Sequence, residues 1–306
     1  MSDDRAAAAS RGRQVVSEAA VRATLSRLDV FGIVRAASLE GSVQHGPVAS
    51  AVLSGHDIGV KIGKVKGAGF GVKVRAGSEG RYLSIAWDNG CRLIGVVESS
   101  YLTYCRTAAA LVLPVAELSS TLTRVLIMGS GRLGQACALL VRDLYPLAII
   151  QLWSPSSRDL TSECAGVLDG WWTPDARRDD EFDLLLTCTR SPEPLPLDTV
   201  NCSYVGVGGA VDGRRRELSG NLLREVGAIY ADDPDEAALR CRDLDGLAKR
   251  TRVRPLSDLA APSRAPVGRT LTFVCGSGGY DALLAAHVLT SRVMPERPPE
   301  AAGDLV

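Results

Sequence analysis

The stretch VLIMGSGRLGQ, residues 125–135, decides the fold because three of its glycines have the spacing G-x-G-x-x-G. An apolar run typical of a buried strand precedes them, and the helix-like segment QACALLVRDLY follows. Glycines also mark simple turns, but between a strand and a helix this spacing favours a dinucleotide-binding turn. There the first glycine allows the turn, the second admits a pyrophosphate and the third lets the helix pack closely. The residues expected to contact the cofactor are Gly129, Ser130, Gly131, Arg132, Leu133 and Gly134.

Apolar runs of similar length recur after this stretch, each separated from the next by a connecting segment, several of them helix-like. They are RVLIMG, AIIQLW, DLLLTC, SYVGVGG, AIYAD and TLTFVCG. Continuous apolar strands that alternate with helices are typical of a parallel sheet covered on both faces. The six runs therefore predict a doubly wound dinucleotide-binding (Rossmann) domain of the α/β class over residues 120–277.

The chain before residue 120 has a different pattern of apolar residues. Residues 17–41 have apolar positions at helical spacing, and residues 47–97 contain short Val-, Ile- and Gly-rich runs that predict an antiparallel or mixed sheet. AspAsnGly at 88–90 predicts a hairpin turn, and 101–118 predicts a helix. A closing helix at 280–293 is expected to return to this smaller α+β domain. Residues 1–12 and the tail 295–306 are expected to be irregular.

Composition excludes several classes of partner. The 306 residues are 46% hydrophobic and 23% charged, with 35 Lys and Arg against 35 Asp and Glu. This balance favours neither nucleic acid nor an anionic membrane as a partner. No apolar run reaches the roughly 18 residues of a membrane span, so we expect a cytoplasmic protein. The eight cysteines show no C-x-x-C spacing, which indicates reduced core thiols and no metal site.

The end of the second apolar run is expected to lie near the adenosine ribose. A carboxylate there would favour NAD, whereas hydroxyl and guanidinium groups suit the 2′-phosphate of NADP. The chain places Ser154, Ser156, Ser157 and Arg158 there, which favours NADP. Asp159 leaves NAD open as the alternative, if its side chain turns inward.

The segment ESSYLTYCRTAAALVL, residues 98–113, resembles the LTxxRTAA segment of the ornithine cyclodeaminase and mu-crystallin family. The likeness continues in GVK at 59–61, GSGRLGQA at 129–136, TCTRSPEP at 187–194 and DGRRREL at 212–218. It implies a substrate-binding and dimerisation domain made of residues 1–119 with 278–306, a homodimer, and Thr187 and Thr189 near the cofactor. It also implies hydride transfer between a nicotinamide and the Cα of a small amino or imino acid.

The resemblance gives two cations a role. Arg106 matches the arginine that binds the substrate carboxylate, and Lys61 matches a lysine that contacts the substrate and helps with proton transfer. A lysine desolvated beside Arg106 would have a lowered pKa, which suits acid–base work. Two plainer interpretations stay open. Arg106 is a surface residue on a helix, or Lys61 belongs to a solvated basic strand face together with Lys64, Lys66 and Lys73.

The chain departs from the family where an aspartate usually follows the fourth strand, because Gly208 stands at that position. Asp212 either replaces it from a longer loop or is an ordinary turn residue. Losing that carboxylate weakens a site for a substrate ammonium group, so ornithine is a doubtful substrate. A nucleotide-binding homologue with weak or lost catalysis, acting as a ligand-binding or regulatory protein, is the alternative function. Asp281 is expected to cap the last helix.

Overall fold

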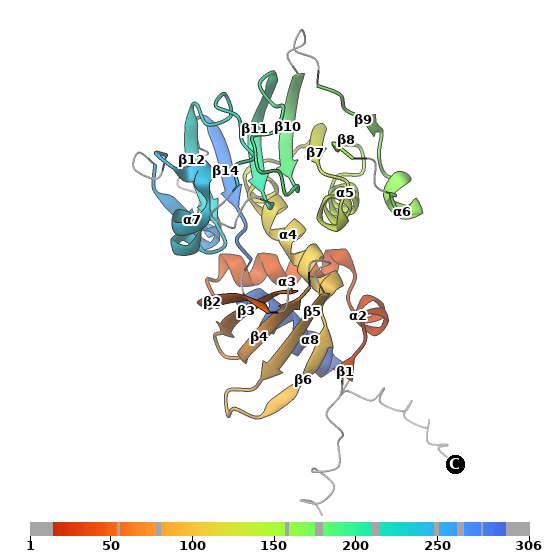
Figure 1. Ribbon diagram of the computed structural model, residues 1–306, viewed down its shortest axis with the longest axis vertical. Coiled ribbons are helices and arrows are strands. Elements are labelled where there is room, and N and C mark those ends of the chain that lie inside the picture. Colours follow the sequence, from red (N-terminus) through yellow and green to blue (C-terminus); the bar gives the residue numbers. More distant parts are fainter. Residues whose placement is uncertain are drawn as a thin grey trace, which may run out of the picture.

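The computed structural model describes residues 15–53, 56–77, 81–156, 159–174, 180–209, 215–247, 251–261, 266–276 and 278–291. This part of the chain forms two lobes, with helix α4 (Ser100–Leu118) running between them (Figure 1). The segments 1–12 and 295–306, which the sequence suggests to be irregular, lie outside the described residues. None of the described helices combines the length and apolarity that crossing a bilayer requires.

The lower lobe in Figure 1 is built on a six-stranded sheet, here called sheet A, with the spatial order β1-β6-β5-β4-β3-β2. Only β1 and β6 are parallel, so the prediction of an antiparallel or mixed sheet is confirmed. The Asp88 carboxylate accepts backbone hydrogen bonds from Gly90 and Arg92, which closes the predicted hairpin turn. The strands are β1 (Val15–Val16), β2 (Val43–Leu53), β3 (His56–Val65), β4 (Gly69–Ala76), β5 (Arg81–Trp87) and β6 (Leu93–Glu98).

Helix α8 (Gly278–Ser291) lies directly on sheet A, against β3 and β4. A Cβ atom on Gly63 would stand 1.9 Å from the backbone nitrogen of Gly279, and one on Gly71 would stand 2.5 Å from the Cβ of Ala282. Only glycine permits this approach of helix to strand. The last helix therefore returns to the first lobe, as expected for a helix that follows the six strands of the dinucleotide domain.

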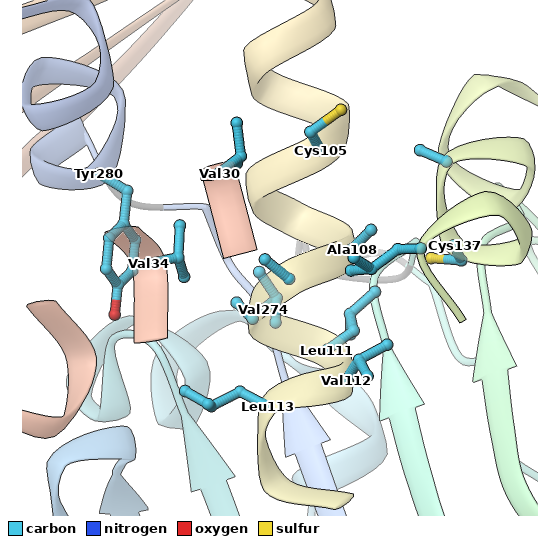
Figure 2. Packing of buried hydrophobic residues seen from close by; sticks show 14 of the residues in the cluster. Val30, Val34, Cys105, Ala108, Leu111, Val112, Leu113, Cys137, Val274 and Tyr280 are labelled. Carbon is cyan, nitrogen blue, oxygen red and sulfur yellow. The ribbon is translucent and has the colours of Figure 1, made fainter. Parts of the chain in front are cut away.

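Helix α4 forms the core between the two lobes, and its residues from Ser100 to Val115 are buried except for Tyr104, which is partly buried. Figure 2 shows side chains of this helix reaching toward Val30 and Val34 of α3 on one side and toward Cys137 of α5 on the other. Helices α2 (Glu18–Thr24) and α3 (Arg27–Leu39) complete the first lobe. Because α4 packs against both lobes, its polar side chains are held in place from two directions.

The upper lobe contains eight parallel strands in the order β13-β12-β14-β11-β10-β7-β8-β9, here called sheet B. All six apolar runs of the sequence are strands of this sheet, which confirms the doubly wound α/β fold. The short edge strands β9 and β13 were not predicted. The strands are β7 (Arg124–Met128), β8 (Ile149–Trp153), β9 (Gly170–Trp171), β10 (Asp180–Thr187), β11 (Val200–Val207), β12 (Val226–Ala231), β13 (Val253–Pro255) and β14 (Arg269–Phe273).

The two faces of sheet B are covered differently. Helices α4 and α5 (Arg132–Leu144) lie on one face. Helix α7 (Pro234–Arg240), the short helix η1 (Arg242–Leu244) and the side chains of Leu195, Leu197, Leu218 and Leu222 cover the other. Helix α6 (Ser162–Ala165) packs beside α5, and η2 (Leu256–Ala260) lies against α3. The strand order reverses beside β7, which is where doubly wound sheets bind their ligands.

Candidate active site

The glycine-rich turn connects β7 to α5 at this reversal point. Gly129 has a φ of +118°, and a Cβ there would stand 2.8 Å from the carbonyl oxygen of Cys188. A Cβ on Gly134 would stand 1.8 Å from the carbonyl oxygen of Gly129, so this glycine allows the helix to pack on the strand. A Cβ on Gly131 would meet no atom within 4 Å. The middle glycine therefore faces open space that another molecule can fill.

The N-terminus of α5 is suited to bind an anion. Gly131 is its N-cap residue and provides no side-chain hydrogen bond to the first backbone N–H groups. Uncapped N–H groups and the helix dipole together favour a phosphate at this end. Arg132, the first residue of α5, is exposed and lines the same space, as do Ser130 and Leu133.

The predicted ribose-binding residues are placed in part. Ser154 and Ser156 line the cleft, where Ser130 Oγ donates to Ser154 Oγ at 3.0 Å and Ser154 Oγ donates to the Ser156 carbonyl at 2.7 Å. Ser157 and Arg158 lie outside the described residues. Asp159 is exposed and does not line the cleft. Of the residues expected near the ribose, Ser154 and Ser156 are therefore the ones that the structure describes in the cleft.

Thr187 and Thr189 are brought together by a buried carboxylate. Glu217 accepts hydrogen bonds from the hydroxyls of both threonines and from the backbone N–H of Thr189. Burial raises the pKa of Glu217, and these hydrogen bonds act in the opposite direction. Thr189 lines the cleft, whereas Thr187 is fully buried beneath it. Of the two, Thr189 is therefore placed to contact a ligand, and Thr187 supports it from below.

The two lobes enclose one continuous cleft of about 1120 Å³ that extends from the glycine-rich turn to sheet A. The lower lobe contributes residues of β2, β3, β4 and α4, and the upper lobe contributes the ends of β8, β10, β11 and β14. A cleft of this size accommodates both a nucleotide and a small second molecule. Lys61 and Arg106, the two predicted cations, both line it.

Lys61 is held by the chain that follows β14. Its Nζ donates to the carbonyl oxygens of Cys275 at 2.5 Å and Gly276 at 2.7 Å. The carboxylate of Asp232 in turn accepts hydrogen bonds from the backbone N–H groups of Cys275 and Gly276. Burial and the neighbouring Arg106 lower the pKa of Lys61. The lysine is thus fixed in position and retains one N–H for another partner.

Arg106 is only 2% exposed, which excludes the interpretation of a surface arginine. Its Nε and one terminal nitrogen contact the Asp281 carboxylate at 3.3 and 3.4 Å. The other terminal nitrogen, Nη1, is buried and has no hydrogen-bond partner. A Cβ on Gly276 would stand 3.0 to 3.3 Å from the two terminal nitrogens of Arg106 and 3.1 Å from Lys61 Nζ. The two cations therefore converge at Gly276.

A third cation, Lys73 of β4, belongs to the same cluster. It is 4% exposed and forms an ion pair of 2.5 Å with Asp281. Burial and Arg106 lower the pKa of Lys73 to about 7. Burial alone would raise the pKa of Asp281, but Arg106 and Lys73 outweigh it and hold the pKa below its usual value. The solvated-face interpretation is therefore wrong for Lys61 and Lys73.

Sequence reasoning missed both Lys73 and Asp281. The triplet Gly-Val-Lys occurs twice, at 59–61 and 71–73, and the antiparallel pairing of β3 and β4 places Lys61 directly opposite Lys73. A hairpin centred on Gly67 would have predicted this pair. Asp281 is the fourth residue of α8, and the contacts described for its carboxylate are with Lys73 and Arg106 and not with the helix N-terminus that it was expected to cap.

The chain has Gly208 where the family has an aspartate. A Cβ there would stand 2.9 Å from Cδ1 of Leu111 and 3.0 Å from Cδ2 of Leu133, so a larger residue requires these two flexible side chains to shift. Asp212, the predicted replacement, lies outside the described residues. No group of three or more metal-ligating side chains occurs in the described part of the chain.

No protein-family model matches the sequence, and no curated protein is significantly similar to it. The structure, in contrast, superposes on solved enzymes over nearly its whole length. The probable ornithine cyclodeaminase from Bordetella pertussis Tohama I gives a TM-score of 0.81 at 20% identity, covering 93% of this chain and 99% of that one.

The chain has the ornithine cyclodeaminase fold. Two further structures with this fold carry cofactors. Thermococcus litoralis Δ1-pyrroline-2-carboxylate reductase, solved with NADH and L-proline, gives a TM-score of 0.78 at 15% identity and covers 90% of this chain and 96% of its own. An archaeal alanine dehydrogenase dimer with bound NAD gives 0.76 at 15% identity, covering 91% and 95%.

Proposed function

We propose that the protein is a nicotinamide-dependent oxidoreductase that acts at the Cα–N bond of a small amino or imino acid. One observation carries this proposal. Lys61 and Arg106 of the lower lobe converge at Gly276, in the same cleft as an uncapped glycine-rich turn of the upper lobe. Structures with this fold that bind NADH with L-proline, or NAD, support it. No described feature favours a homologue that has lost catalysis.

The cofactor we propose is NADP, with NAD as the alternative. The residues present fit such a group, because the space beside Gly131 is open and the N-terminus of α5 is free to bind a pyrophosphate. Ser154 and Ser156, together with Arg132, are the described groups for the 2′-phosphate. When bound, a nicotinamide supplies or accepts the hydride.

The cation cluster of Lys61, Lys73 and Arg106 binds and polarises the substrate. The unpartnered Nη1 of Arg106 and the remaining N–H of Lys61 hold the substrate carboxylate, which sets the position of Cα. Lys73 holds a proton close to neutral pH and is oriented by Asp281. It is therefore a second group, beside Lys61, that can exchange a proton with the substrate nitrogen.

We propose a cytoplasmic homodimer without nucleic-acid or membrane partners, whose subunits associate through the outer face of sheet A. Burial alternates along β4 and β5, so one side of the sheet covers the core and the other is partly exposed. The partly exposed side is apolar, with Ile62, Val72, Leu83 and Ile85 among its residues. The substrate and dimerisation domain is proposed to comprise 1–119 with 278–306, and the dinucleotide domain 120–277.

Titration with NADPH and NADH, followed by turnover measurements on cyclic and acyclic imino acids, tests the function. We expect tight binding of NADPH and reduction of at least one imino acid. Arg106→Met should lower kcat/KM at least 100-fold, whereas Arg254→Met, at an exposed position of β13, should leave it unchanged. If the methionine variant does not fold, Arg106→Lys, which keeps the positive charge, takes its place in the same measurement. Nucleotide binding without any turnover, or full activity of a folded Arg106 variant, would reject the proposal.

A further inference from the structure

The charged side chains that line the cleft are positive in all of its described part. Lys61, Lys73, Arg75 and Arg106 come from the lower lobe, and Arg132, Arg190, Arg215 and Arg240 from the upper lobe. No aspartate or glutamate is among the described lining residues. A substrate ammonium group placed here would meet cations on several sides, and each such contact is unfavourable in a partly desolvated cleft.

The carboxylates that lie behind the lining are already occupied. Asp281 is shared by Lys73 and Arg106, and Asp232 accepts the backbone N–H groups of residues 275 and 276. Glu217 accepts hydrogen bonds from Thr187 and Thr189. The carbonyl oxygens of residues 275 and 276 accept from Lys61. Each of these groups therefore already serves other donors, and an ammonium group placed here would share acceptors that also hold the neighbouring cations or backbone.

A second positive centre lies beyond the cluster of Lys61, Lys73 and Arg106. Arg190 follows β10, is exposed, and forms no ion pair with a described residue. Tyr82 of β5 lines the same cleft from the lower lobe, as Arg106 does. Burial and Tyr104 raise the pKa of this tyrosine, while Arg75, Arg106 and Arg190 oppose the rise. Arg190 from one lobe and Tyr82 from the other therefore line one cleft.

We propose that the substrate is an imino dicarboxylate without an ammonium group, which the enzyme consumes in the direction of reduction. One carboxylate binds Lys61 and Arg106, and the second binds Arg190 and the hydroxyl of Tyr82. This inference rests on the proposed function and specifies its substrate. In the step, hydride from the reduced nicotinamide forms the new C–H bond, the C=N π electrons move to nitrogen, and nitrogen takes a proton from a lysine ammonium. The products are the secondary or primary amine and the oxidised nicotinamide.

Calorimetric titration with stable ligands tests the charge requirement. Protein saturated with NADP⁺ is titrated with 2-oxoglutarate, 2-oxobutyrate, L-glutamate and L-ornithine. 2-Oxoglutarate, a dianion without nitrogen, should bind at least about tenfold more tightly than the monoanion 2-oxobutyrate, because its second carboxylate forms additional charge-assisted hydrogen bonds. L-Glutamate should bind more weakly than 2-oxoglutarate, and L-ornithine should not bind measurably. Equal or tighter binding of the amino acids would overturn the proposal.

Matched variants locate the second carboxylate. Arg190→Gln should lower the affinity for 2-oxoglutarate until it equals the affinity for 2-oxobutyrate. The affinity for 2-oxobutyrate itself should not change. Arg254→Gln removes an exposed arginine outside the cleft and should change neither. An Arg190→Gln protein that binds both oxo acids like wild type would overturn the placement. An initial titration with NADP⁺ distinguishes failure of the proposed function from failure of this inference. If NADP⁺ does not bind, the proposed function is rejected. If NADP⁺ binds but the four acids do not show the expected order of affinity, only this inference is rejected.

Discussion

At the residue scale, one carboxylate compensates two buried cations. Lys61 and Lys73 are directly opposite each other on neighbouring strands, an arrangement that repulsion makes unfavourable. Asp281 binds Lys73 and Arg106 with a side chain that is fully buried, and Asp232 stabilises the backbone that holds Lys61. The cluster therefore depends on Asp281 for its charge balance.

Asp281→Asn should lower the free energy of unfolding by about 3–5 kcal/mol, since it leaves buried positive charges without their partner. Urea denaturation monitored by tryptophan fluorescence measures the change. Asp198→Asn, at an exposed position, is the control and should stay within about 0.5 kcal/mol of wild type. A loss no larger than that of the control would show that the carboxylate is unimportant for charge balance.

The activity should depend on pH through Lys73. Burial and Arg106 lower the pKa of this lysine to about 7, so its ammonium form is lost as pH rises through that value. A proton donor must be in its acid form, so kcat for imine reduction should fall above about pH 7. Lys73→Met should show a lower kcat without this alkaline fall. A fall of the same midpoint in the variant would assign the titration to another group.

Arg106 and Lys61 were predicted at this scale because their motifs resemble a known family. Asp281 was predicted only as a cap, because its contact with Arg106 spans 175 positions of the chain and no local pattern reports it. Lys73 could have been found, since the second Gly-Val-Lys triplet is visible in the sequence. Which charged side chains become buried and paired depends on how the two lobes pack together. The spacing of apolar residues in the sequence does not specify this packing.

At the scale of elements, the strands and helices followed closely from apolar spacing. Continuous runs marked the six long strands of sheet B, and alternation marked those of sheet A. The edge strands β9 and β13 contain two and three residues, too few for a pattern. The close packing of α8 on sheet A depends on Gly63 and Gly71, which leave room for the helix. This role can be recognised only once helix and strands are in contact.

Gly71→Ala should destabilise the protein by about 1–3 kcal/mol, because the added methyl overpacks the contact with α8. Gly32→Ala is the matched control. Gly32 is an exposed residue inside α3 with no atom within 4 Å of an added Cβ, so this change should stabilise the protein by about 0.5–1 kcal/mol. Thermal unfolding of both variants checks the opposite signs, and destabilisation of similar size in both would contradict the packing argument.

At the scale of the whole molecule, the outer face of sheet A is an apolar surface that the described part of one chain leaves partly exposed. Ile62 and Leu83 are 40% and 43% exposed on it. Exposed patches of this kind in a soluble fold commonly mark an interface. A similar structure is that of a dimer, which supports a second copy as the occupant.

The double variant Ile62→Lys, Leu83→Glu should convert a dimer into monomers, because it buries charges in the proposed interface. Size-exclusion chromatography with light scattering gives the mass. Leu147→Glu, at a position that is 95% exposed in the upper lobe, should leave the dimer intact. A wild-type protein that elutes as a monomer at micromolar concentration would contradict the proposal.

The position of α8 also affects the order of events during biosynthesis. Every strand of both sheets leaves the ribosome before the helix that carries Asp281. While the entire upper lobe is translated, the glycine-lined face of sheet A therefore has no helix to cover it. Lys61 and Lys73 meanwhile lack the negative charge of Asp281. The first lobe is therefore the part of the nascent chain that stays exposed longest without its covering helix, and a chain truncated before residue 278 lacks the carboxylate that pairs with Lys73 and Arg106.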